Sequence, residues 1–117
     1  MNTHILKGHV TTAEIEWRPL VEGGVDTRGI SVKVLRIDPT TGRAPSFLLR
    51  FEPGGNYPYH IHPAGEELFV LSGNCLIEGT MLEAGDYLYT PPGSKHAVQS
   101  RTGCTILFQV PEEVVIL

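Results

Sequence analysis

A set of three histidines and one glutamate is the feature that most restricts how this chain can fold. His60 and His62 are one residue apart, so in an extended strand both side chains point to the same face. Glu66 has the same parity across the short bend at 63–65, and His96 follows thirty residues later in a distant segment. A fold that unites these side chains must bring separate segments of the sequence together.

The chemistry of these four side chains points to a metal ion. Neutral imidazoles and a carboxylate are ligands that divalent first-row metals accept. We therefore predict that the four residues hold one divalent transition metal per chain. Four protein ligands on an octahedral ion leave two positions for water or a substrate. Imidazole binds iron, zinc, nickel and copper alike, and carboxylate also suits manganese, so these residues do not decide which metal is bound.

Glycines and prolines at fixed distances from the ligands extend the pattern. The segment 54–73 resembles the first motif of the cupin family, G(x)5HxH(x)3,4E(x)6G, and 85–100 resembles the second, G(x)5PxG(x)2H(x)3N. One position departs, because Ser100 stands where the second motif has Asn, which is not a metal ligand in the family. The matched positions are Gly54, His60, His62, Glu66, Gly73, Gly85, Pro91, Gly93 and His96.

Within that superfamily the chain is similar to the small ChrR-like cupins, from about Trp17 to Phe108. Members of that group include C-terminal domains of anti-sigma factors and some non-haem iron dioxygenases. The resemblance therefore implies a fold and a metal site, but it does not choose between those functions. The segments that carry it are 17–20, 37–44, 62–67, 91–97 and 103–105.

Glu66 and Glu67 compete for the carboxylate position. Strand parity favours Glu66, and so do the six residues that separate it from Gly73. Glu67 is expected to point to the opposite face, where it is solvated or makes a surface or subunit contact.

The remaining sequence predicts an all-β fold, a double-stranded β-helix (jelly-roll) cupin barrel. Short runs of Val, Ile, Leu, Phe and Tyr alternate with turn residues, which is typical of a sandwich or barrel. Residues 1–24 are expected to pack on the barrel or on a dimer partner, and 25–117 to form a single cupin domain. Hairpin turns are expected at Gly73-Asn74 and Gly79-Thr80. The expected strands are 32–37, 46–51, 59–62, 66–72, 75–78, 81–83, 86–90, 97–100 and 105–110.

Composition is that of one globular domain. With 117 residues and 41% hydrophobic content, the chain has room for one core. A formal net charge of −4 and the lack of a basic stripe argue against a nucleic-acid partner. We expect no membrane segment and no signal peptide, and we take the cytoplasm as the location. Cys75 and Cys104 are then expected to be reduced thiols that pack as small buried hydrophobes.

Other polar and aromatic residues are weaker candidates. Tyr57 and Tyr59 could donate a hydrogen bond to a bound oxygen, although packing in the turn is the simpler expectation. Gln109 could orient a histidine from within the pocket or could lie on the outer face of its strand. Arg50 is expected to be solvated or ion-paired rather than bound to an anionic substrate. Trp17 is expected to pack in the core or against a second subunit.

The function predicted from these residues is that of a metal-dependent dioxygenase for a small organic compound, such as a hydroxyketone, diketone or thiol. Fe(II) is favoured, because it can bring substrate oxygen and dioxygen into contact. One alternative is a sensor or small-molecule-binding cupin whose metal, for example Zn(II), stabilises the barrel. Another is an isomerase or decarboxylase that uses the metal as a Lewis acid. An anti-sigma factor would need a preceding zinc-binding helical domain, which we do not expect here.

We also predict a twofold homodimer. A small barrel with exposed edge strands tends to cover them, and the family resemblance also implies dimers. Segment 1–24 offers Ile15, Trp17, Leu20 and Val21 for burial, so this segment or an outer sheet face is expected to pack on the partner. Light scattering should give twice the chain mass, and a strictly monomeric mass would contradict the prediction.

Overall fold

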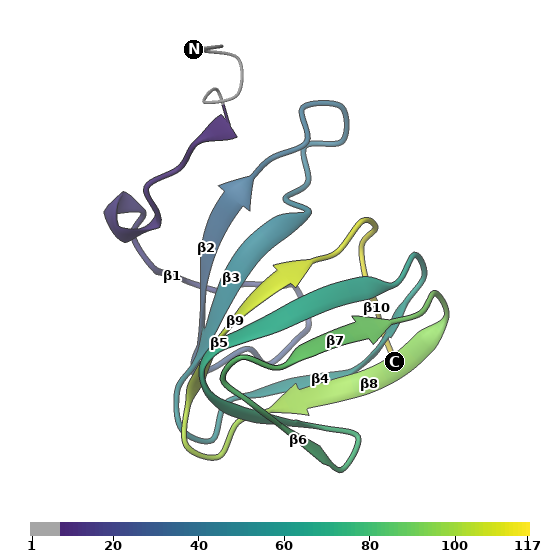
Figure 1. The fold of residues 1–117 in the computed structure, drawn as a ribbon. Helices are drawn as coiled ribbons and strands as arrows, with labels where there is room; N and C mark the ends of the chain where they lie inside the picture. Colours follow the sequence, from purple (N-terminus) through teal and green to yellow (C-terminus); the bar gives the residue numbers. More distant parts are fainter. Residues whose placement is uncertain (1–7) are drawn as a thin grey trace.

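The computed structural model describes residues 8–117, which form a curled antiparallel β-sheet (Figure 1). Within these residues no helix is long and apolar enough to cross a membrane. The elements are the 3-10 helix η2 (Thr12–Glu14) and the strands β1 (Arg18–Pro19), β2 (Ile30–Arg36), β3 (Ser46–Phe51), β4 (Asn56–His62), β5 (Glu66–Ile77), β6 (Thr80–Glu83), β7 (Tyr87–Thr90), β8 (Ser94–Gln99), β9 (Cys104–Gln109) and β10 (Val115–Ile116).

Strand β5 joins the two layers of the fold. The sheet order is β1-β2-β3-β9-β5-β8-β4-β10, and β6 and β7 also pair with β5. The first part of β5 pairs with β7 and β9, whereas residues 74–77 pair with β6 and β8. The sheet therefore curls, and Figure 1 shows β4 and β8 in a different layer from β2, β3 and β9. The predicted all-β jelly roll is confirmed.

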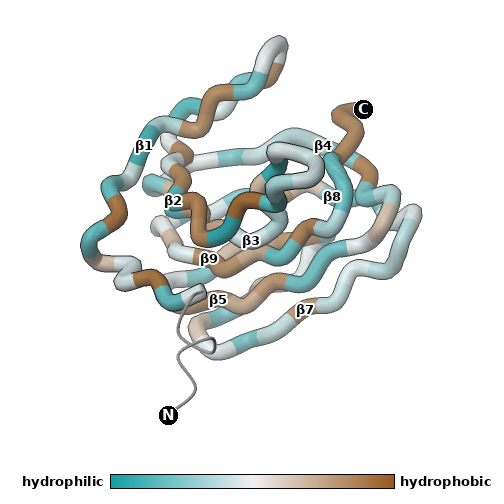
Figure 2. The backbone as a smooth tube through the Cα atoms, turned by 90° about the horizontal axis from the view of Figure 1, so that it is seen from above, coloured by the Kyte–Doolittle hydropathy of each residue, from teal (hydrophilic) through white to brown (hydrophobic). Residues whose placement is uncertain are grey.

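The core lies between the layers because each strand turns alternate side chains inward. In β9, Ile106 and Phe108 are buried while Gln109 is exposed. Figure 2 shows hydrophobic residues alternating with hydrophilic ones along these strands. Cys75 and Cys104 are both buried in this core as free thiols, which confirms the expected packing role.

One predicted turn is wrong. The sequence predicts a hairpin at Gly73-Asn74, but β5 continues through both residues as a single strand of 12 residues. Its register against β9 shifts between Val70 and Ser72, and Gly73 has a φ of +71° opposite Cys104. A bulge with a glycine at positive φ bends a strand without ending it. The same turn residues therefore mark the place where β5 passes from one layer to the other.

Other boundaries agree or differ by a few residues. The second predicted hairpin is present, with its turn one residue earlier than Gly79-Thr80. Ile77 pairs with Thr80, and the two turn residues between them, Glu78 and Gly79, both have a positive φ. Strand β8 begins earlier than predicted, so His96 lies inside it. The two-residue strands β1 and β10 were not expected, since they are too short to show a periodic pattern.

The described part of the N-terminal segment packs on the edge of the sheet, where β1 pairs with β2. The Trp17 ring lies 4.9 Å from Nζ of Lys33 and 4.5 Å from Cζ of Arg50, within reach of cation–π attraction. Arg50 also pairs with Glu52 at 3.8 Å, as expected of an ion-paired residue. Residues 1–7 of the predicted segment lie outside the described residues, and the division of the chain at residue 24 stays a prediction.

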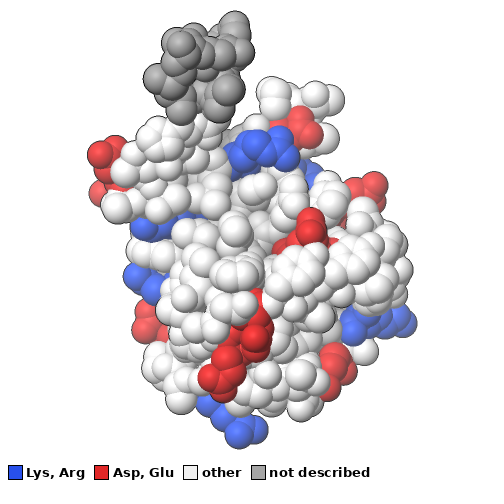
Figure 3. Space-filling view, in the orientation of Figure 1, with Lys and Arg blue, Asp and Glu red and all other residues white. Residues whose placement is uncertain are grey.

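Charged side chains of both signs are scattered over the face drawn in Figure 3. On that face, Lys and Arg of the described residues form small separate groups beside Asp and Glu rather than one continuous basic patch. The expected lack of a nucleic-acid partner remains a prediction that binding measurements can test.

Candidate metal centre

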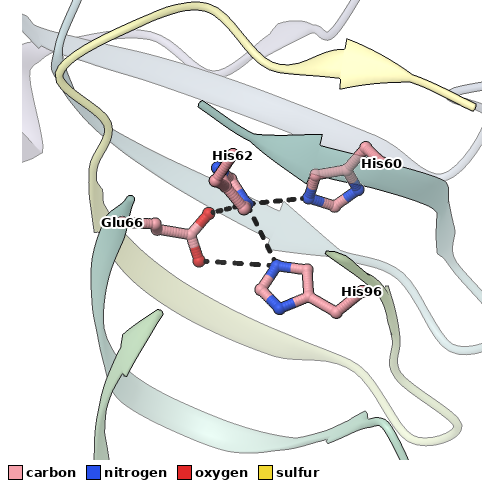
Figure 4. Close-up of side chains that lie close together, drawn as sticks. All are labelled: His60, His62, Glu66 and His96. Atoms are coloured by element: carbon pink, nitrogen blue, oxygen red, sulfur yellow. Dashed lines mark hydrogen bonds and ion pairs between the residues drawn. The ribbon is translucent and has the colours of Figure 1, made fainter. Parts of the chain in front are cut away.

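The four predicted ligands meet between the two layers of the fold (Figure 4). His60 and His62 come from β4, and His96 in β8 lies directly opposite His60 in the antiparallel ladder. Glu66 is the first residue of β5. All four are buried, with exposed fractions of 1–3%. One ligand atom from each lies within 4.8 Å of every other, so the structure brings the complete predicted set together.

The imidazoles meet through the same ring nitrogen. Nε2 of His62 lies 2.9 Å from Nε2 of His60 and 3.0 Å from Nε2 of His96. It also lies 2.7 Å from Oε2 of Glu66, whose other oxygen is 3.8 Å from Nε2 of His96. A neutral imidazole nitrogen carries one hydrogen or one lone pair. Hydrogen bonding therefore cannot satisfy three close partners of one nitrogen.

A divalent cation at the centre would satisfy the cluster. Two nitrogens bound to one ion at about 2.1 Å and at right angles lie about 3.0 Å apart, close to the spacings seen here. Oε1 of Glu66 is buried without a hydrogen-bond partner. A buried carboxylate is costly unless it is paired or coordinates a metal. The four residues therefore fit a divalent metal ion.

A β-bulge in β4 orients the first of the ligands. From Tyr57 to His60, β4 advances three residues while β8 advances two. The extra residue falls beside Pro58, and proline suits a bulge because it has no N–H to donate to the ladder. Nδ1 of His60 donates to the carbonyl oxygen of Pro58 at 2.7 Å. This bond selects the tautomer whose Nε2 lone pair points into the cluster.

The same bulge decides which tyrosine faces inward. Regular alternation would place Tyr57 and Tyr59 on the outer face, opposite to His60. Instead, Tyr57 is 7% exposed and its ring packs edge-on against His60 at 4.9 Å, whereas Tyr59 is 45% exposed. Gln109 is exposed on β9. Of the three weaker candidates, only Tyr57 lines the cavity beside the ligands, and Tyr59 and Gln109 do not.

The structure also separates the two adjacent glutamates. Glu66 is 3% exposed, whereas Glu67 is exposed and accepts a hydrogen bond from Oη of Tyr87 at 2.7 Å. Gly65 permits the preceding bend, because it has a φ of +81° and a Cβ there would lie 2.8 Å from the carbonyl oxygen of Thr90. Glu66 therefore occupies the inward position that strand parity predicts.

A cavity of about 620 Å³ opens onto the cluster and touches His60, His62 and Glu66. This volume is within the range of small-molecule sites, about 300–1,000 Å³. Its walls are mostly apolar and include Val32, Leu49, Phe51, Phe108, Val110 and Val114. A compound held in the cavity would therefore contact both hydrocarbon side chains and the metal ligands.

Three charged residues of the cavity wall were missed by sequence reasoning: Glu22, Arg43 and Glu113. Glu22 accepts a hydrogen bond of 2.6 Å from Oη of Tyr57. Burial, followed by this hydrogen bond, raises the pKa of Tyr57, so its hydroxyl keeps its proton at neutral pH and acts as a hydrogen-bond donor. All three charged residues lie outside the strands, where no periodic pattern indicates which side faces the cavity.

Burial keeps two of the imidazoles neutral. It lowers the pKa of His60 to about 4, against the opposing effect of the hydrogen bond to Pro58. Burial likewise lowers the pKa of His96 to about 4, against the attraction of Glu66. Because only a neutral imidazole binds a metal, both side chains are ready to coordinate at neutral pH.

We expect the metal-free protein to lose stability as the pH falls from about 6.5 to about 4. Histidine in the unfolded chain binds a proton with a pKa of about 6.5. Folded His60 and His96 stay neutral down to about pH 4, so the unfolded state binds more protons in this window and becomes favoured. Urea midpoints at a series of pH values would measure the loss, which should be smaller for His96→Gln. A midpoint that rises on acidification would contradict it.

The fold and the cluster together define a cupin with a buried site of three histidines and one glutamate that fits a divalent metal. Residues 7–112 match the ChrR Cupin-like domain family, and the chain belongs to that family. The small ChrR-like cupin inferred from the motifs is thereby confirmed.

Several known proteins are similar to this chain. It is 36% identical over 77 residues to the DNA damage-repair/toleration protein DRT102 of Arabidopsis thaliana, a match covering 61% of this chain and 23% of that protein. Solved structures include the polyketide cyclase RemF from Streptomyces resistomycificus, with a TM-score of 0.73, 20% identity and coverage of 93% of this chain and 84% of that one.

Two further structures are described as acetylacetone dioxygenases. A putative one from Methylibium petroleiphilum PM1 has a TM-score of 0.78 and 19% identity over 93% of this chain and 79% of that one. The other, from Acinetobacter johnsonii, has a TM-score of 0.75 and 19% identity over 91% of this chain and 74% of that one. At such identities the likeness shows a shared fold alone.

Proposed function

We propose that this protein is an Fe(II)-dependent dioxygenase that acts on a small, largely apolar organic compound. One observation carries the proposal: the buried cluster of three histidines and one glutamate borders an apolar cavity of about 620 Å³. Three of the four ligands line that cavity, so a compound held there lies beside the metal position. One acetylacetone dioxygenase and one putative acetylacetone dioxygenase among the proteins of similar fold support the choice of reaction.

Each part of the site has a task in such a reaction. Bound Fe(II) would supply an electrophilic, redox-active centre at which a substrate oxygen and dioxygen meet. With Fe(II) bound, the three neutral imidazoles and one carboxylate would leave one net positive charge at the site, which would favour an anionic oxygen such as that of a diketone enolate. The apolar wall holds the hydrocarbon part of the compound and excludes water from it. His60 is kept in one orientation by Pro58.

Metal analysis and oxygen uptake together test this proposal. Protein purified without oxygen should contain iron, and it should consume oxygen when acetylacetone is added. Chelation should abolish the uptake, Fe(II) should restore it, and Zn(II) should not, because zinc has no redox chemistry. Stoichiometric zinc in the purified protein, with no oxygen uptake by the iron-loaded form on diketones or thiols, would overturn the proposal.

A second candidate is an oxygen-independent conversion in which the metal acts only as a Lewis acid. The shared fold of the polyketide cyclase RemF is the observation that favours it. Turnover of a carbonyl compound by the zinc-loaded protein under anaerobic conditions would distinguish this candidate from the dioxygenase.

A further inference from the structure

The segment between β1 and β2 forms one wall of the metal cavity. We call residues 20–25 the wall turn, and five of its six residues line the cavity. Its start is fixed, because the amide of Leu20 donates to the carbonyl oxygen of Ile30 at 3.0 Å and the Leu20 side chain packs on the core. The amide of Val25 donates to the carbonyl oxygen of Glu22 at 3.2 Å and closes the turn on itself.

One side-chain bond ties the wall turn to the strand that carries two metal ligands. Oη of Tyr57 donates to Oε2 of Glu22 at 2.6 Å. Among the described residues, it is the only hydrogen bond that joins residues 21–25 to another part of the chain. Tyr57 itself is buried and packs against His60. The bond therefore joins a surface turn to the rigid bulge beside the metal position.

The wall turn has little stiffness of its own. Gly23 and Gly24 are adjacent, and no atom lies within 4 Å of a Cβ placed at either position. Glycine has more backbone freedom than any other residue, so this pair does not fix the path of the turn. Val21 is 84% exposed and adds little packing. Its base is held at Leu20, whose carbonyl oxygen also accepts a hydrogen bond from Oγ1 of Thr27. The position of residues 21–25 against the barrel thus depends on the bond between Glu22 and Tyr57.

We propose that Glu22 is a specificity-determining residue of this cupin. By accepting the Tyr57 hydrogen bond, it holds the wall turn against the barrel and limits the size of a compound that can reach the metal. The inference rests on the proposed function only in taking the cavity as the way to the metal. It requires no particular reaction there.

Amide hydrogen exchange of the metal-loaded protein tests the bond itself. Glu22→Ala and Tyr57→Phe should each speed exchange of the Val25 amide about fivefold, the effect of losing one net hydrogen bond. Glu22→Gln should stay near wild type, because a glutamine oxygen accepts the same bond. Glu112→Gln is the matched control, since this exposed carboxylate lies outside the cavity. Wild-type exchange in Glu22→Ala would overturn the proposal.

Binding of two probes to the cobalt-loaded protein tests the size limit. Imidazole and 4-phenylimidazole both coordinate metals, and the cobalt absorption spectrum reports their binding without turnover. Glu22→Ala should raise the affinity for 4-phenylimidazole about tenfold relative to the affinity for imidazole. Glu22→Gln should keep the wild-type ratio of the two affinities. An equal loss of affinity for both probes in Glu22→Ala would show that Glu22 has a merely structural role and would overturn the proposal. Failure of either probe to bind in wild type and Glu22→Ala would do the same.

These outcomes are separate from those of the proposed function. If the wild type takes up no oxygen but Glu22→Ala shifts the ratio of probe affinities, the role of Glu22 stands and the dioxygenase proposal fails. If the wild type takes up oxygen but Glu22→Ala leaves that ratio unchanged, the dioxygenase proposal stands and the role of Glu22 fails.

Discussion

Alanine in place of any one of the four clustered ligands should remove most of the bound metal and lower the melting temperature. A metal that binds only the folded state stabilises it by mass action, by about 2.7 kcal/mol when its concentration is one hundred times Kd. Losing that contribution in a domain of this size corresponds to a fall of about 10 °C. The variants are His60→Ala, His62→Ala, Glu66→Ala and His96→Ala, and elemental analysis with thermal scans measures both effects.

The neighbouring Glu67→Ala is the matched control for Glu66→Ala. Both variants remove one carboxylate from β5, but Glu67 is exposed and bonds Tyr87 on the outer face. Glu67→Ala should therefore retain metal and should lose stability on chelation as the wild type does. If Glu66→Ala retained the metal and Glu67→Ala lost it, the register assigned to the start of β5 would be wrong by one residue. Wild-type metal content in all five variants would remove the site and the proposed function with it.

Strand parity and the motif match together could predict which side chains gather at the site. The period of two along a strand fixes His60 and His62 on one face. His96 comes from another strand, β8, and was predicted by its place in the second cupin motif rather than by local geometry. The inward position of Tyr57 could not be predicted from that period, because the bulge reverses it. Pro58 within a strand was the available signal, since proline inside a sheet indicates a bulge or an edge.

The cavity wall depends on contacts between distant segments. Glu22 reaches Tyr57 across 35 positions of the sequence, in a turn whose path is set by its contacts with the barrel rather than by periodicity. Strand β10 has two residues and is defined by its pairing with β4. Gly73-Asn74 has the composition of a hairpin turn, and the same residues serve equally well in a bulge. The local sequence therefore does not decide between a hairpin and a bulge, and tertiary packing does.

Gly73→Ala should destabilise the fold severely, although the added group is one methyl in the middle of a strand. Gly73 has a φ of +71°, which an L side chain rarely adopts. Its Cβ would overlap the carbonyl oxygen of Gly103 and lie 2.8 Å from Cα of Cys104, so β5 and β9 would have to separate. Backbone strain and overpacking together cost about 3–5 kcal/mol, a large part of the total stability of a small domain.

Gly79→Ala separates the two causes of that loss. Gly79 has a similar φ of +79°, but no atom lies within 4 Å of a Cβ built there. This variant should therefore show the backbone strain without the clash, at a cost of about 1 kcal/mol. Urea unfolding of both variants measures the difference. Equal losses of stability would mean that the backbone at Gly103, just before β9, moves aside at little cost. The passage of β5 between the two layers would then not depend on close contact at Gly73.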